Sequence, residues 1–247
     1  MTSQGPVVSA PRSSATVLLL RDDPFEVLLV SRAARGAFAS ALVFPGGAID
    51  PGDHDPGWRE LATDFDEVTS DERAVRIGAI REVWEETGIL LADDQAVGTA
   101  PARAGQEFRE AVTEAGVRIR LDALAHFGHW ITPVVEPRRF DTHFFLAAVS
   151  RDVVAVPDGA ETLTAEWMSP ARAVELARSG ERPIIFPTMV NLARLAESSN
   201  SAEALAAARA RPRYTVQPEI ALEPDGARRV TILAESGYPV TEWREFR

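Results

Sequence analysis

The sequence predicts a globular domain of the α/β or α+β class. The chain has 247 residues, of which 45% are apolar and 26% charged, the balance of an ordinary soluble protein with a sizeable core. Patterns typical of strands and of helices are mixed along the chain and do not strictly alternate, and no internal repeat occurs. These observations favour a mixed sheet with helices over an all-helical or all-β fold.

Strands are predicted where short apolar runs are bounded by turn residues. Residues 1–13 are rich in Ser, Pro and Gly and predict a flexible tail. The runs Ala15–Leu20 and Phe25–Arg32 flank an Asp-Asp-Pro turn and predict a β-hairpin. Ala41–Phe44 predicts a short strand that a Pro-Gly-Gly turn ends. The remaining predicted strands are His129–Val135, Arg139–Val149 and a second hairpin of Tyr214–Leu222 and Arg228–Ala234.

Helices are predicted where apolar residues recur with helical spacing. The first follows an acidic stretch over residues 50–72, which we interpret mainly as a solvated loop. Ser70 is its expected N-cap, and Gly88 lies just past its end. The other predicted helices are Phe108–Ala115, residues 170–179, Thr188–Glu197 and Ala202–Ala210.

Composition excludes several kinds of function. The net charge of −11 opposes general binding to nucleic acid or to an anionic membrane. The chain has no cysteine, which excludes disulfides, thiolate catalysis and cysteine-based metal sites. It also has no lysine, which excludes Schiff-base chemistry and a phosphate-loop lysine. No apolar run reaches the roughly 18 residues that a membrane span needs, and we expect a cytoplasmic protein.

The first helix carries the strongest chemical signal. Glu82, Glu85 and Glu86 project within about 100° of one another on a helix. Carboxylates at this spacing repel each other, but they form the oxygen cluster that Mg²⁺ or Mn²⁺ prefers. By itself such a stripe is also typical of a solvated acidic face. The opposite side of the helix carries the large apolar residues Ile77, Ile80 and Trp84.

Together with the Gly-Gly turn upstream, this helix resembles the Nudix box. Gly47 matches its first glycine, and Asp53 stands where the pattern has Glu. Residues 81–89, Arg-Glu-Val-Trp-Glu-Glu-Thr-Gly-Ile, match the end of the box at every specified place. The spacer over residues 54–80 is 20 residues longer than in the family pattern. We expect Trp58 and Leu61 to pack this insertion against the domain, since a longer loop costs little closure entropy.

The resemblance extends over roughly residues 15–200. In this range the chain is similar to the peroxisomal coenzyme A diphosphatase-like branch of the Nudix hydrolases. The insertion, the VLLVSR…FPGG segment and the later HWITP…RFDT segment carry it. It implies the Nudix fold, a mixed β-sheet sandwiched between helices. The expected division is a tail over 1–13, a Nudix domain over 14–200 and a C-terminal extension over 201–247 packed on that domain.

The resemblance also implies roles for individual residues. Arg81 would hold the loop and orient a carboxylate. Asp53 and Gly88 would be structural positions of the box. Glu161 is a candidate metal ligand or base, and it is also typical of a plain loop carboxylate. The implied Mg²⁺ or Mn²⁺ ligands are Glu82, Glu85, Glu86 and the carbonyl of Gly46. The residues proposed to contact substrate are Arg32, Arg35, Arg139 and Gly47.

The implied activity is metal-dependent hydrolysis of a nucleoside diphosphate linked to another group, with Glu82 or Glu161 as the base. Coenzyme A or acyl-coenzyme A is the substrate that we favour on the basis of the resemblance. ADP-ribose, a nucleotide sugar, a dinucleotide such as NADH and a non-catalytic nucleotide-binding module are the alternatives. A small-molecule partner is expected, and the sequence leaves a homodimer open. No histidine receives a role, because His126 and His129 are three residues apart and predicted to face opposite sides of a strand.

Overall fold

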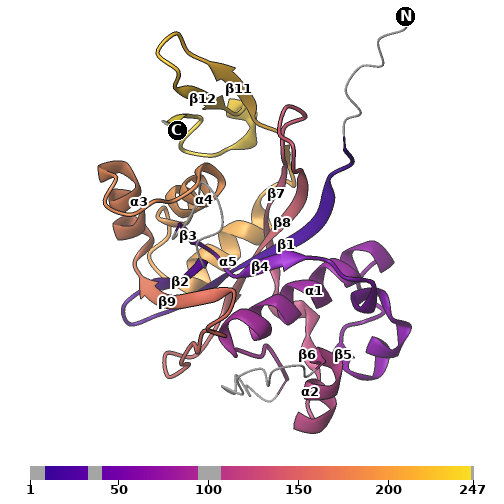
Figure 1. Cartoon of the computed structure of the whole chain (residues 1–247). Coiled ribbons are helices and arrows are strands. Elements are labelled where there is room, and N and C mark those ends of the chain that lie inside the picture. The colour runs from indigo at the N-terminus through magenta and orange to yellow at the C-terminus, as the bar shows by residue number, and fades with distance from the viewer. Residues whose placement is uncertain (1–8, 33–40, 94–106, 246–247) are drawn as a thin grey trace, which may run out of the picture.

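The computed structural model describes residues 9–32, 41–93 and 107–245. Its main sheet has the strand order β10-β7-β8-β1-β2-β3, with β4 paired to β1 and β9 paired to β2. Helices cover both faces of this sheet (Figure 1). A mixed α/β sandwich was predicted, and the structure confirms it.

The centre of the sheet is formed by β1 (Arg12–Arg21), which has a partner on each side. The hairpin partner β2 (Glu26–Arg32) runs antiparallel to β1, as predicted. On the other side β8 (Phe140–Ala148) runs parallel to β1 along nine residue pairs. β7 (Ala125–Ile131) pairs antiparallel with β8. The β1–β8 pairing therefore joins segments that lie far apart in the sequence and makes the sheet mixed.

Short strands complete the sheet at its ends. β3 (Leu42–Val43) and β9 (Thr162–Met168) pair with β2, and β10 (Thr215–Val216) pairs with β7. The strand predicted over Ala41–Phe44 ends before the Pro-Gly-Gly turn, as expected, but the sequence did not predict that Gly46–Ala48 then forms β4, which pairs with β1. Gly46 has φ +154°, and a Cβ there would lie 2.3 Å from the carbonyl oxygen of Ala15. Only glycine allows this close approach of two strands.

Two helical layers enclose separate apolar clusters. One face of the sheet carries α1 (Ser70–Thr87) and α2 (Phe108–Ala115), the latter with the predicted bounds. Alternate residues of β1 point to each face, because side chains of a strand alternate. The other face carries α3 (Pro170–Ser179), α4 (Phe186–Leu195) and α5 (Ser201–Ala210).

Helix α1 is fixed by one apolar stripe and by its ends. Ile77, Ile80 and Trp84 are each no more than 1% exposed, as their spacing predicted. The N-cap is Thr69, one residue before the expected Ser70. Gly88 ends the helix in the left-handed conformation with φ +69°, and its N–H donates to the carbonyl of Trp84 at 2.8 Å.

The acidic stretch over residues 50–72 is folded against the domain over part of its length, so its interpretation as a solvated loop was partly wrong. It forms the 3₁₀ turns Pro51–His54 and Pro56–Glu60 and the strand β5 (Ala62–Thr63), which pairs with β6 (Ile119–Arg120). The Trp58 side chain is 2% exposed, and its ring centroid lies 5.3 Å from that of Phe108. Its indole N–H donates to the carbonyl of Gly52 at 3.0 Å.

The segment after α5 forms a second, small sheet of β11 (Glu219–Leu222), β12 (Arg228–Thr231) and β13 (Glu242–Glu245). The predicted hairpin corresponds to β11 and β12. Buried side chains from this segment, among them Val230 and Tyr238, join the apolar cluster that α4 and α5 form on the sheet. Across the parts of the chain described here, none of the helices combines the length and apolarity that crossing a membrane requires.

We predict that Trp58→Ala lowers the free energy of unfolding by about 3–5 kcal/mol, because it removes a large side chain that attaches the insertion to α2. Denaturant unfolding followed by circular dichroism measures this. Glu60→Ala, an exposed change in the same 3₁₀ turn, is the control and should leave the stability near that of the parent chain. Equal stability of the two variants would contradict this account of the insertion.

Candidate active site

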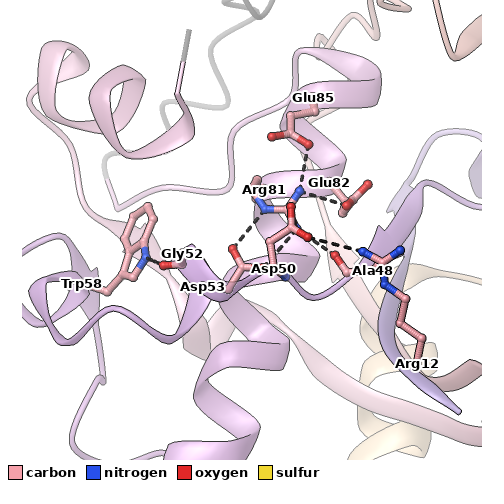
Figure 2. A network of polar contacts seen from close by, with 9 residues as sticks. All are labelled: Arg12, Ala48, Asp50, Gly52, Asp53, Trp58, Arg81, Glu82 and Glu85. Atoms are coloured by element: carbon pink, nitrogen blue, oxygen red, sulfur yellow. Dashed lines mark hydrogen bonds and ion pairs between the residues drawn. The ribbon is translucent and has the colours of Figure 1, made fainter. Parts of the chain in front are cut away.

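Arg81 lies at the centre of a polar network between α1, β4 and the start of the insertion (Figure 2). Its guanidinium is bound to Asp53 through two bonds, Nε–Oδ1 and Nη2–Oδ2, each of 3.0 Å. Nη2 also donates to the carbonyl of Ala48 at 2.8 Å, and Nη1 donates to Glu82 and Glu85 at 2.9 Å. One side chain therefore connects three segments of the box.

The long insertion does not separate Asp53 from Arg81. Asp53 is only 2% exposed, and its Oδ2 also accepts from the backbone N–H of Asp50 at 2.9 Å. The insertion starts after Asp53 and ends before α1. It therefore extends away from the site while Asp53 and Arg81 stay paired. Asp53 therefore pairs with Arg81 although it stands where the family pattern has Glu.

The three glutamates of the box are held at different depths. Glu86 is 3% exposed and accepts from the backbone N–H of Gly46 at 3.0 Å. The side chain of Glu82 is 16% exposed and that of Glu85 is 41% exposed. Glu82 lies so close to Gly47 that a Cβ there would meet Glu82 Oε2 at 2.4 Å. Any larger residue at this position would displace the carboxylate.

Burial and mutual repulsion characterise the electrostatics of this site. Burial disfavours the Arg81 cation, but hydrogen bonding and attraction to Asp53 and the charges of Glu82 and Glu85 raise its pKa above the ordinary value. Burial also raises the pKa of Glu85, and the charge of Glu82 adds to this, while Arg81 acts in the opposite direction. Three carboxylates, those of Asp53, Glu82 and Glu85, thus share a single guanidinium. The hard oxygens of Glu82, Glu85 and Glu86 form a donor set that fits a divalent cation.

The other predicted residues are less closely tied to this network. Glu161 lies at the N-terminal side of β9, whose residue Thr162 pairs with Arg32 at the end of β2. The carboxylate of Asp158 accepts from the backbone N–H of Glu161 at 3.1 Å, while the Glu161 side chain is exposed. Arg35 lies outside the described residues.

Arg139 donates hydrogen bonds to two backbone carbonyls. Its Nε donates to the carbonyl of Thr132 at 3.1 Å and its Nη1 to the carbonyl of Ser9 at 2.9 Å. These bonds tie the β7–β8 connection to the segment that leads into β1. Contact of Arg139 with substrate therefore stays a prediction, and it would require the guanidinium to serve both purposes.

Sequence reasoning missed Asp50 and Arg12. Asp50 Oδ2 lies 3.8 Å from Arg81 Nη2, and its other oxygen lies 3.6 Å from Arg12 Nη2. Asp50 is one residue of the acidic stretch with no distinguishing motif. Arg12 reaches the site only because β4 pairs with β1, which the sequence did not predict.

The expectation for the histidines was wrong in one respect. A β-bulge between His126 and Gly128 adds a residue to β7. His126 and His129 therefore lie on the same face, and both rings contact that of His143 on β8, at centroid distances of 5.8 and 4.2 Å. Burial lowers the pKa of His126 and of His143 to about 4, and neighbouring positive charge contributes to both shifts.

The fold and the box define a protein of the Nudix class. The sequence matches the NUDIX domain over residues 10–103 and the NUDT19 Nudix domain over residues 62–195. The latter match covers more than half of the chain, and the chain therefore belongs to the NUDT19 Nudix domain family. Nudix hydrolases generally use divalent metal ions, which agrees with the carboxylate set described above.

Known proteins agree with this assignment. The crystal structure of a NUDIX hydrolase from Alicyclobacillus acidocaldarius has a TM-score of 0.66 and 29% identity, and covers 81% of this chain and 97% of that one. Acyl-coenzyme A diphosphatase NUDT19 of Xenopus laevis is 27% identical over 69% of this chain and 60% of its own length. The human protein of the same name is 27% identical over 70% of this chain and 60% of its own. The chain thus spans about 60% of the length of these two acyl-coenzyme A diphosphatases.

We predict that Asp53→Ala lowers the free energy of unfolding by about 3 kcal/mol, because it leaves the buried Arg81 guanidinium without its bidentate partner. Chemical unfolding at neutral pH measures the change. Arg12→Ala removes an exposed, long ion pair of the same network and should cost less than about 1 kcal/mol. A loss for Asp53→Ala as small as that for Arg12→Ala would show that the insertion, and not Asp53, holds the loop.

Proposed function

We propose that this chain hydrolyses the diphosphate bond of coenzyme A or acyl-coenzyme A in the presence of Mg²⁺ or Mn²⁺. The observation that carries the proposal is the complete box: Asp53, Arg81 and the three glutamates meet at β4 despite the insertion. Membership of the NUDT19 family and the relatives named acyl-coenzyme A diphosphatase support the choice of substrate. A homodimer, a cytoplasmic location and the division at residues 13 and 200 stay predictions.

The residues that would hold the metal are Glu82, Glu85 and Glu86, with the Gly46 carbonyl as a further oxygen ligand. A bound divalent ion would neutralise diphosphate charge and lower the pKa of a water molecule. This suits a chain with a net charge of −11, in which an anionic substrate otherwise meets repulsion at the carboxylates.

The protein's own residues would set the geometry. Arg81 holds Glu82 and Glu85 through its Nη1, which fixes the carboxylate oxygens relative to the β4 backbone. The N–H of Gly46 holds Glu86 at the buried end of the stripe. Glu82 or Glu161 would accept the proton of the attacking water as the bond to phosphorus forms. Transfer at phosphorus needs mainly positioning and charge neutralisation, so the absence of cysteine and lysine is no obstacle.

The proposed substrate is tested by measuring product release from coenzyme A, acyl-coenzyme A, ADP-ribose, NADH and a nucleotide sugar, each with Mg²⁺ or Mn²⁺. We expect preferential cleavage of coenzyme A or its acyl form, with 3′,5′-ADP as the nucleotide product. Preference for another compound would keep the reaction class and overturn the substrate. No turnover of any compound, with nucleotide binding retained, would instead indicate a binding module.

We predict that Glu86→Gln lowers kcat by more than about 100-fold, beyond the effect typical of residues that only support a metal ligand. The fold should be kept, because the glutamine amide oxygen can still accept from the N–H of Gly46. Steady-state kinetics with the preferred substrate and circular dichroism measure both effects. Glu110→Gln, an exposed change on α2, is the matched control. Turnover of Glu86→Gln close to that of the control would remove Glu86 from the proposed site.

A further inference from the structure

A second group of metal-binding side chains lies on β7 and β8, outside the box. We call His129, Asp141 and His143 the His–Asp cluster. Each residue offers a ligand atom, and these three atoms lie within 4.8 Å of one another. All three residues are half-buried, with the side chains of His129 and Asp141 20% and 35% exposed. The cluster is therefore accessible to an ion from solvent, yet partly enclosed.

The sheet itself brings these residues together. His129 and His143 are direct partners in the β7–β8 pairing, and Asp141 lies two residues before His143 on the same face. The two imidazole rings stack at a centroid distance of 4.2 Å and an interplanar angle of 14°. The bulge next to Gly128 is what turns His129 to this face. Backbone pairing thus brings the three side chains together without a flexible loop. An imidazole nitrogen binds a metal ion in the plane of its ring, so one of the two rings has to turn out of the stack for both to bind one ion.

A third strand orients His129. Its Nδ1 lies 2.8 Å from the hydroxyl oxygen of Thr215 on β10, while its Nε2 is in close contact with Asp141 Oδ1. When Nδ1 donates to Thr215, Nε2 presents its lone pair to a carboxylate oxygen, and both atoms are acceptors. A cation that both atoms bind would resolve this conflict, and it requires the Asp141 side chain to move out of its direct contact with Nε2. An outer hydrogen bond on the far nitrogen is also the usual arrangement of a metal-binding histidine.

The alternative occupant of this position is a proton. In that case His129 Nε2–H donates to Asp141 and Thr215 donates to Nδ1, which gives a simple histidine–aspartate pair. This alternative accounts for His129 and Asp141 but gives no function to the stacked His143, whose ring nitrogen belongs to the same group. Arg213, a cation whose charge acts on His143, has a side chain that is 62% exposed and paired with Glu72 at 3.1 Å, so its charge is partly neutralised.

We propose that the His–Asp cluster is a zinc-class transition-metal site, with two imidazole nitrogens and one carboxylate oxygen as ligands and solvent in the open position. Two nitrogens and one oxygen favour Zn²⁺ over Mg²⁺, which prefers oxygen ligands alone. The cluster and the box flank the same strand, because Ala15 of β1 pairs with His143 on one side and with Gly47 on the other. A bound metal would also strengthen, through Thr215 and His129, the existing pairing of β10 with β7.

The test is calorimetric titration of the full chain with Zn²⁺ in millimolar Mg²⁺, which occupies the oxygen ligands of the box. We expect one Zn²⁺ per chain. His129→Gln and Asp141→Asn should each weaken binding by about 100-fold or more, and Thr215→Val, which keeps all three ligands, by about 10-fold. His126→Gln, next to the cluster, and His54→Gln, in the insertion, are the matched controls and should bind like the parent chain.

Two further measurements separate this site from other effects. Long-range ¹H–¹⁵N spectra should show Zn²⁺-dependent shifts of the ring nitrogens of His129 and His143 and none for His54. Unfolding temperatures in chelator establish that the variants are folded before titration. Zn²⁺ affinity that is unchanged in both His129→Gln and Asp141→Asn would overturn the proposal and place the ion elsewhere. Absence of stoichiometric binding to the parent chain would also overturn it, in favour of the histidine–aspartate pair.

Discussion

The pairing of Arg81 with Asp53 is the interaction on which the candidate active site depends. A guanidinium that is largely removed from water needs several acceptors, and here Asp53, the Ala48 carbonyl and two glutamates supply them. These acceptors come from β4, the 3₁₀ turn Pro51–His54 at the start of the insertion, and α1. The cost of burying the charge is offset only when all three segments are in place. The same contacts then hold the carboxylates at fixed positions.

The β1–β4 pairing is the second constraint. The backbone of Gly46 approaches β1 more closely than any side chain would allow, and its N–H faces Glu86. β1 in turn is held by nine residue pairs with β8. The buried end of the glutamate stripe is therefore anchored to the centre of the sheet, whereas Glu85 at the other end stays exposed enough to meet a solvated substrate.

The sequence predicted the parts of the site that lie on one helix. The spacing of Ile77, Ile80 and Trp84 determines which face of α1 is buried, so the glutamate stripe followed directly. The contact between Asp53 and Arg81 spans an insertion, and loop length alone does not determine where the ends meet. β4 was missed because Pro-Gly-Gly is equally typical of a turn. The shared face of His126 and His129 was missed because a bulge changes the strand period without a distinct sequence signal.

Helix α1 explains how a 20-residue insertion can be accommodated next to a site that requires fixed geometry. Its N-terminal half is tied down independently of the box: Arg76 donates to the carbonyls of Leu121 and Leu124, each at 2.6 Å, and to Glu72. Trp84 contacts Phe108 on α2, the same ring against which Trp58 of the insertion packs. The insertion thus adds apolar contacts to a helix whose position is already determined by the sheet and by α2. Because Asp53, just before the insertion, remains bound to Arg81 of α1, the length of the insertion has no direct influence on the distances among the carboxylates.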